Sequence, residues 1–200
     1  MRDTTNILLV GVGGQGIILA SDLLSNLALT LGLDVKKSEI HGMSQRGGSV
    51  ESHVRLGEEV LSPLIPRGRA QYLIAMEESE ALRYRDYLSP DAVVLCSTFR
   101  VIPASVTTGG QKYPDHEEIE RALRRHCSSV AMLDIPGAMV RVGNARTANV
   151  ILLGCLSRLL PYPLEAWLEM LNTSLPAKIL EVNLRAFEEG RQLAGIHLGE

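Results

Sequence analysis

The chain has few cysteines, and their spacing excludes a class of function. Cys96, Cys127 and Cys155 lie far apart, and no Cys-x-x-Cys pair occurs in the sequence. An iron–sulfur cluster usually takes four thiolates at short, characteristic spacings. We therefore expect that this chain does not carry electrons itself. An odd number of widely spaced cysteines also suits a reducing compartment, so we expect a cytoplasmic protein.

A basic excess and a long apolar run are also missing. The net charge is −3, which favours neither nucleic acid nor an acidic membrane surface. Glycine, serine or a charged residue interrupts every apolar stretch before it could span a bilayer, and the amino terminus lacks the layout of a signal peptide. With 46% hydrophobic and 22% charged residues among 200, the chain is typical of one globular domain.

The sequence begins with a strand, a helix and a second strand around a glycine turn. Apolar residues from Asn6 to Val12 indicate a buried strand, the apolar face between Gln15 and Leu31 indicates a helix, and residues 35–40 indicate another strand. Because a helix connects the two strands, we expect them to be parallel neighbours. The loops that follow them, 11–16 and 41–48, should then emerge at one edge of the sheet.

The next segment departs from this alternation. In residues 49–56, apolar and polar side chains alternate, which predicts a half-buried strand antiparallel to a neighbour. Further strands are expected at 72–76, 92–97 and 130–135, and helices at 77–88, from the Asp115 capping box to about Cys127, near 145–160, after Pro163 and after Pro176.

We therefore predict an α/β fold that is Rossmann-like, with three α/β/α layers and a mixed, mostly parallel sheet. A helical C-terminal region completes it. Residues 1–200 should form a single domain, with an α/β core over 1–135 and a helical part over 136–200.

The first glycine loop, residues 11–16, fits the pattern Gly-x-Gly-x-x-Gly at a strand-to-helix turn. Such a turn lets the backbone approach a ligand, and the helix N-terminus offers free N–H groups to an anion. The alternative is a turn that serves only strand–helix packing. A dinucleotide site would need an acid after the second strand. Glu39 lies near the right distance, but a glycine loop follows it where a helix would be expected.

The second loop, residues 41–48, combines three glycines with polar side chains. Arg46 offers a planar fork of donors to a carboxylate or phosphate, so the loop could accept an anion or face a partner; otherwise it is a surface turn. The candidate ligand- or interface-binding residues are Gly11, Gly13, Gly14, Gln15, Gly16, His41, Gly42, Met43, Ser44, Gln45, Arg46, Gly47 and Gly48.

No residue is assigned to metal binding or catalysis. His41 and His53 lack a third ligand at a useful spacing. Ser44 lacks the strand–turn–helix context of a nucleophile. Cys96 and Cys155 stand in apolar segments and are expected in the core.

Taken together, the two loops resemble a known family. Gly-Val-Gly-Gly-Gln-Gly-Ile (11–17), Glu-Ile-His-Gly-Met-Ser-Gln-Arg-Gly-Gly-Ser-Val (39–50) and Ser-His-Val-Arg (52–55) are similar to the gamma-type domain of 2-oxoacid:ferredoxin oxidoreductases. The second loop resembles the version found in the beta subunits of indolepyruvate ferredoxin oxidoreductases. Shorter matches at 62–66, 80–84, 148–154 and 181–187 extend the resemblance in order over nearly the whole chain.

This resemblance implies a non-catalytic small subunit of an enzyme that converts arylpyruvates to aryl-acetyl-CoA and reduces ferredoxin. It implies that thiamine diphosphate, magnesium and the 4Fe-4S clusters belong to a large alpha subunit, the partner of this chain, and that CoA is a co-substrate of the complex. Ferredoxin would be reached through the complex. The isolated chain should self-associate through the surface that its partner covers.

Two alternatives stay open. The chain could be the gamma subunit of an enzyme for pyruvate, 2-oxoglutarate or 2-oxoisovalerate. It could also be a free-standing nucleotide-binding protein built on the first glycine loop.

Overall fold

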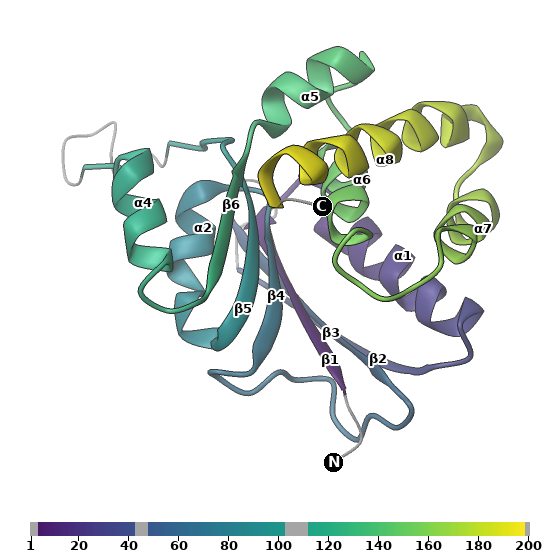
Figure 1. The fold of residues 1–200 in the computed structure, drawn as a ribbon, viewed down its shortest axis with the longest axis horizontal. Coiled ribbons are helices and arrows are strands. Elements are labelled where there is room, and N and C mark those ends of the chain that lie inside the picture. Colours follow the sequence, from purple (N-terminus) through teal and green to yellow (C-terminus); the bar gives the residue numbers. More distant parts are fainter. Residues whose placement is uncertain (1–3, 43–47, 103–111, 199–200) are drawn as a thin grey trace.

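The computed structural model describes residues 4–42, 48–102 and 112–198 and has three layers, with a six-stranded sheet between two sets of helices (Figure 1). The order of the strands across the sheet is β2-β3-β1-β4-β5-β6, and β3 alone runs antiparallel to its neighbours. The predicted three-layer α/β fold with a mixed, mostly parallel sheet is confirmed. The strands are β1 (Thr5–Val12), β2 (Asp34–His41), β3 (Ser49–Gly57), β4 (Ala70–Ala75), β5 (Leu88–Ser97) and β6 (Ser129–Leu133).

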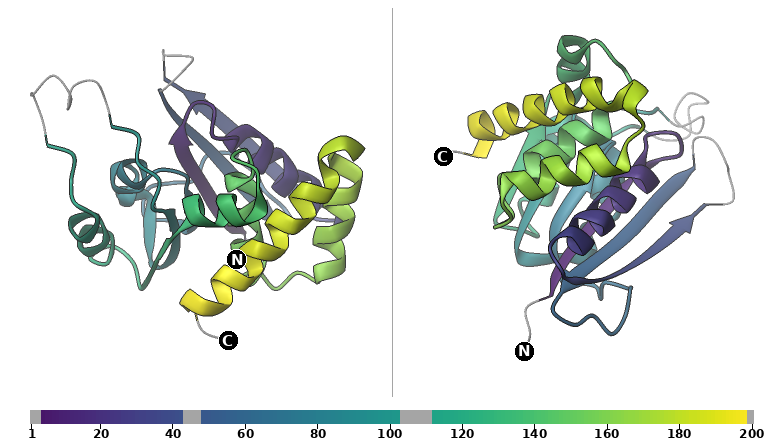
Figure 2. Two further views of the ribbon diagram at one scale, coloured as in Figure 1. Left: turned by 90° about the horizontal axis from the view of Figure 1, so that it is seen from above. Right: turned by 90° about the vertical axis from the view of Figure 1, so that its right-hand side faces the viewer.

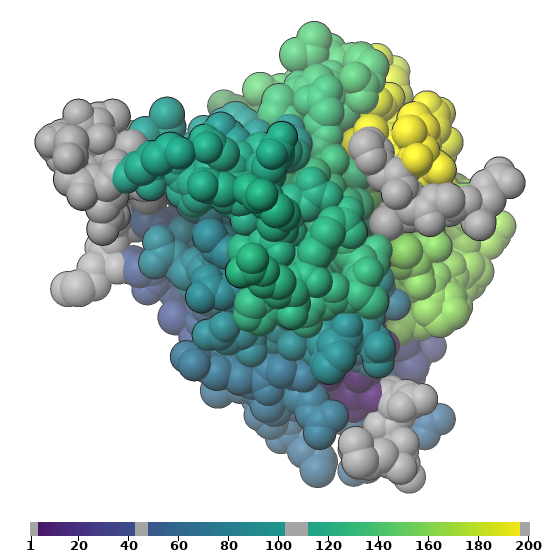
Figure 3. Space-filling model, turned by 60° about the vertical axis from the view of Figure 1, so that its left-hand side comes forward, coloured from purple at the N-terminus to yellow at the C-terminus, as the bar shows by residue number. Residues whose placement is uncertain are grey.

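The helices divide between the two faces of this sheet. One layer contains α1 (Ile17–Thr30), α5 (Ile135–Val142), α6 (Ala148–Leu156), α7 (Leu164–Ser174) and α8 (Ala177–Leu198). The other contains α2 (Glu78–Arg83), the 3-10 helix η1 (Arg85–Tyr87) and α4 (His116–Leu123). Figure 2 shows α1, α7 and α8 stacked over the sheet. In Figure 3 the teal-green segment that contains α4 occupies the middle of the face, and the brighter green above it is α5. Among the described helices, none combines the length and apolar character that crossing a bilayer requires.

The prediction that β1 and β2 are neighbours was wrong. They run in the same direction, but β3 lies between them and pairs antiparallel with both. The reason is the short connection between β2 and β3, which makes a hairpin in which His41 pairs with Val50. The charged strand β2, with Lys36 and Lys37, is left at the edge of the sheet, where lysine discourages pairing with another chain.

The prediction that β3 is half-buried was also wrong. Glu51 and His53 are buried as fully as the apolar residues of the other face. The segment after β3 covers them, since the backbone N–H of Ile65 donates to Nδ1 of His53 at 3.2 Å. The ring of Tyr87 packs against the His53 ring with 5.5 Å between centroids. A strand between two neighbours, with both faces covered, has no solvent side.

The helix predicted at 77–88 is shorter in the structure. It ends at Arg83, and a 3-10 turn then places Tyr84 and Tyr87 side by side, with ring centroids 6.1 Å apart. Side chains three residues apart eclipse in such a turn. The tighter geometry therefore turns both rings toward the sheet and lets β5 begin at Leu88, earlier than predicted.

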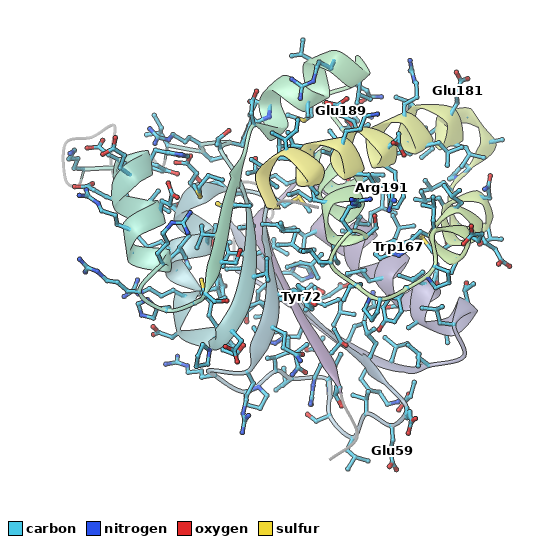
Figure 4. The ribbon with its side chains drawn as sticks, in the orientation of Figure 1. Glu59, Tyr72, Trp167, Glu181, Glu189 and Arg191 are labelled. Atoms are coloured by element: carbon cyan, nitrogen blue, oxygen red, sulfur yellow. The ribbon has the colours of Figure 1, made fainter. Side chains whose placement is uncertain are left out.

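The C-terminal helices are fixed by a close crossing of α6 and α8. A Cβ added to Gly154 would collide with the carbonyl of Phe187, and one added to Gly190 would collide with that of Ile151. Trp167, from α7, lies beneath α8, and Arg191 extends from α8 toward the end of α6, where it donates to the hydroxyl of Ser157 at 2.9 Å (Figure 4). Glu181 is on the outer side of α8. Trp167 is fully buried, as are Cys96 and Cys155, which confirms that these cysteines belong to the core.

Candidate functional site

The two glycine loops meet at one edge of the sheet, as predicted. The backbone N–H of Gly13 donates to the carbonyl of Gly48 at 2.9 Å, and Gly42 N–H donates to Ser49 at 3.0 Å. The loops meet although β1 and β2 are not neighbours, because both strands run in the same direction and so end at the same edge of the sheet. Met43, Ser44, Gln45, Arg46 and Gly47 lie outside the described residues, so the role of Arg46 stays a prediction.

The first loop is a tight turn that depends on left-handed glycines. Gly14 has φ 101° and Gly16 has φ 80°, a region that side chains other than glycine rarely adopt. Gly16 is the N-cap of α1, and no side chain caps the helix there. The first turn of α1 therefore begins with N–H groups that the helix itself cannot pair.

Internal contacts account for the first and last glycines of the Gly-x-Gly-x-x-Gly pattern. A Cβ on Gly11 would lie 2.6 Å from Oε1 of Gln15, and one on Gly16 would lie 2.6 Å from Nδ2 of Asn149. Asn149, at the start of α6, donates from that nitrogen to the carbonyl of Gly16 at 3.1 Å. Gly13 carries the bond to the second loop. Gly11 and Gly16 thus have structural reasons that involve no dinucleotide.

Glu39, the acid considered for a ribose, is already engaged. Its carboxylate accepts hydrogen bonds from Lys37 at 2.9 Å and from the hydroxyl of Ser21 at 3.2 Å. Both partners belong to β2 or α1, so this carboxylate ties the edge strand to the helix. This is a structural task, and it counts against a dinucleotide site.

A cavity of about 320 Å³ lies at the carboxyl ends of β1 and β4. From β1 the chain leaves through α1 to one face of the sheet, and from β4 it leaves through α2 to the other. The crevice outside such a switch point is where open α/β sheets commonly bind ligands. The cavity walls include Gly14, Gln15, Met76, Phe99, Met139 and Arg146.

The lining of this cavity combines apolar and polar groups. Met76, Phe99 and Met139 offer apolar surface, and Arg146 adds a cation from the exposed connection between α5 and α6. The glycine turn adds the start of α1. A site of this composition suits a ligand that has both an anionic and an apolar part.

A second cavity of about 500 Å³ lies on the other side of the same turn. Its walls come from Ile17, Ile18, Val50 and His41, together with the loop glycines. Gly14 lines both cavities, so the turn forms a partition between them. Of the predicted site residues that the structure describes, Gly13, Gly14, Gln15, Gly16, His41 and Gly42 line one cavity or the other.

Two buried glutamates near the first cavity were missed by the sequence analysis. Glu77 and Glu78 follow β4 and are less than 2% exposed. Glu77 accepts hydrogen bonds from Val101 N–H at 3.1 Å and from the hydroxyl of Tyr113. Glu78 accepts from Arg100 at 2.8 Å. These carboxylates bind residues on both sides of 103–111. The backbone N–H of Glu78 donates to the carbonyl of Phe99, which lines the cavity, at 3.2 Å.

The glutamates raise the pKa values of their partners. The pKa of Tyr113 lies well above its usual value because the ring is half-buried and its hydroxyl donates to Glu77. The pKa of Arg100 rises because of its hydrogen bond to Glu78. The sequence gives no sign that Glu77 and Glu78 bind residues of the segment 99–116, because the partners are more than twenty residues apart in the chain.

His41 and His53 are not brought to one site. His41 lines the second cavity, whereas His53 is buried in β3. In the part of the chain that the structure describes, no three His, Cys, Asp or Glu side chains are placed to hold a metal ion.

Comparison with known proteins agrees with this architecture. Residues 6–193 match the family model described as pyruvate ferredoxin/flavodoxin oxidoreductase. The chain is 40% identical over 187 residues to the indolepyruvate oxidoreductase subunit IorB of Archaeoglobus fulgidus, covering 92% of each chain. It is 39% identical over 197 residues to the subunit of the same name in Thermococcus kodakarensis, covering 97% of this chain and 98% of that one.

Among solved structures, the 2-oxoglutarate:ferredoxin oxidoreductase of Magnetococcus marinus, with 2-oxoglutarate, coenzyme A and succinyl-CoA bound, is similar to this chain with a TM-score of 0.76. The sequence identity is 20%, and the similarity covers 98% of this chain and 32% of that one. The fold is therefore shared with one part of a longer chain.

Proposed function

Because the chain belongs to the pyruvate ferredoxin/flavodoxin oxidoreductase family, we propose that it is the non-catalytic small subunit of an indolepyruvate ferredoxin oxidoreductase. The observation that carries this assignment is the identity of 39–40% to subunits of that name over more than nine-tenths of this chain. The complex oxidatively decarboxylates arylpyruvates to aryl-acetyl-CoA and reduces ferredoxin. Its location would be cytoplasmic.

The catalytic groups belong to a large partner subunit. An iron–sulfur cluster needs a set of accessible thiolates, and here Cys96 and Cys155 are fully buried. Burial raises the pKa of Cys155 to about 12 and that of Cys96 well above its usual value, so neither is a thiolate at neutral pH. These residues do not fit a cluster, and we assign the clusters, thiamine diphosphate and magnesium to the partner.

Some large apolar side chains are exposed and could be covered by such a partner. Leu61 is 89% exposed, Val140 is 80% exposed, and Ile102 and Ile40 are about half exposed. These residues belong to separate segments of the chain, so they do not by themselves mark the contact surface. We propose that the isolated chain self-associates where its partner would bind.

The cavity between β1 and β4 is where we place contact with CoA. This co-substrate carries phosphates and a long, largely apolar arm, which the combination of Arg146, the start of α1 and the apolar walls fits. The relative with the bound CoA shares this fold. The loop pair 11–16 and 41–48 would lie at the same interface with the partner and its substrate.

The gamma subunit of an enzyme for another 2-oxoacid remains the second candidate, because the solved relative carries 2-oxoglutarate. The free nucleotide-binding protein is less well supported, since Glu39 is engaged and close internal contacts explain the glycines at positions 11 and 16.

Reconstitution tests the assignment. The chain alone should be colourless and should not reduce a viologen dye with indolepyruvate and CoA, whereas the co-expressed large and small subunits should. A brown chromophore or turnover in the isolated chain, or full activity of the large subunit without it, would reject the proposal.

A further inference from the structure

We propose that Gln15 is a positioning residue, whose amide fixes the glycine turn against the end of β4 and so sets the shape of the CoA cavity. This inference rests on the proposed function. It assigns Gln15 an indirect task, since its amide is committed to the protein itself.

The amide of Gln15 bridges the two strands that flank the switch point. Its Oε1 accepts a hydrogen bond from Val12 N–H at 2.7 Å, at the end of β1. Its Nε2 donates to the carbonyl of Met76 at 3.1 Å, directly after β4. An N–H on one side and a carbonyl on the other leave only one orientation of the amide that satisfies both partners.

The surroundings are built to admit this side chain. Gly11 has no Cβ, and one placed there would lie 2.6 Å from Gln15 Oε1 and 2.9 Å from the Cβ of Met76. The first glycine of the loop thus provides the space in which the amide crosses from β1 to β4. The backbone N–H of Gln15 also closes the turn by donating to Val12 at 3.1 Å.

The position of the turn decides the geometry of the cavity. Gly14 and Gly16, the two neighbours of Gln15 in the chain, line the wall of the cavity, and α1 begins directly after Gly16. Without the amide, the turn loses its bond to β4 and keeps the backbone bond from Gly13 to Gly48. N–H groups that bind an anion act well only when they are held in place before the ligand arrives.

The test compares Gln15→Ala and Gln15→Glu in the complex of large and small subunits. The first variant removes both bonds, and the second keeps the acceptor for Val12 but places a carboxylate oxygen opposite the Met76 carbonyl. We expect the KM for CoA to rise about tenfold in each, which corresponds to about 1.4 kcal/mol. The kcat and the KM for the 2-oxoacid should stay within about twofold of wild type.

Gln192→Ala is the matched control, because this glutamine is exposed on α8 and bonds only weakly to Glu188 at 3.5 Å. It should leave all three parameters unchanged. An unchanged KM for CoA in both Gln15 variants, or a fall in kcat that follows a loss of folded protein in both, would overturn the inference. A wild-type complex without CoA-dependent turnover would instead reject the proposed function, and this inference with it.

Discussion

Gly190→Ala should destabilise the chain, although the same change in most helices stabilises it. Alanine in a helix interior is favoured over glycine by about 0.8–1 kcal/mol. At Gly190, however, the new Cβ would lie 2.8 Å from the carbonyl carbon of Ile151 and 3.1 Å from the nitrogen of Cys155, with the Ile151 oxygen nearer still. Real Cβ atoms essentially never approach another atom closer than 3.0 Å, and the Ile151 oxygen lies far inside that limit, so α6 and α8 would have to separate by about 1 Å or more.

The expected magnitude follows from these opposing effects. Overpacking of a tight core typically costs about 1–3 kcal/mol. This contact is with backbone atoms, which cannot rotate away, so the upper part of that range applies. After subtraction of the helix propensity of alanine, we expect a net loss of about 2 kcal/mol. For a chain of this length, that lowers the melting temperature by roughly 4–8 °C.

Gly195→Ala on the same helix is the control. A Cβ there would meet nothing within 4 Å, so we expect stabilisation of about 0.5–1 kcal/mol. Urea unfolding followed by circular dichroism measures both variants and gives free energies even where thermal unfolding is irreversible. If Gly190→Ala were as stable as Gly195→Ala, the crossing of α6 and α8 would not be as close as described.

Two further predictions concern buried and loop residues. Burial lowers the pKa of His53 below its ordinary value of 6.5, so the unfolded chain binds more protons than the folded one; stability should be complete above about pH 6.5 and decline as the pH falls toward the folded-state pKa. His53→Gln should flatten this decline in urea titrations across that range, and an unchanged slope would show that His53 is not its source. Arg46→Lys keeps the charge and loses the planar fork, so turnover of the complex should fall while the melting temperature of the free chain stays the same. If both fall together, Arg46 has a structural role.

Local sequence patterns predicted the helices and strands. They did not predict contacts between residues that are distant in the sequence. The apolar run before Gly11 and the apolar face of α1 are properties of single segments, so β1, its turn and the helix were predictable. The position of β3 between β2 and β1 was not predictable. The crossover rule applies to strands that are joined by a helix, and β3 is instead joined to β2 by a hairpin. The charges of β2, suited to an edge, were the available signal.

The meeting of the two loops could be predicted, but the contacts around them could not. Two loops after two strands of the same direction had to share an edge, and they do. The sequence placed Glu77 and Glu78 only at the start of a predicted helix, whereas in the structure they are buried and bind Arg100, Tyr113 and Val101. Nothing in the spacing of these residues links them. The engagement of Gln15 with Met76 was hidden in the same way.

Substrate preference of the purified complex tests the central claim most directly. The two subunits, co-expressed and purified together, would be assayed for CoA-dependent dye reduction with indolepyruvate, pyruvate and 2-oxoglutarate in turn. The account predicts the highest kcat/KM with indolepyruvate, and no activity when this chain is omitted. A higher kcat/KM with pyruvate or 2-oxoglutarate, or undiminished activity of the large subunit alone, would contradict it.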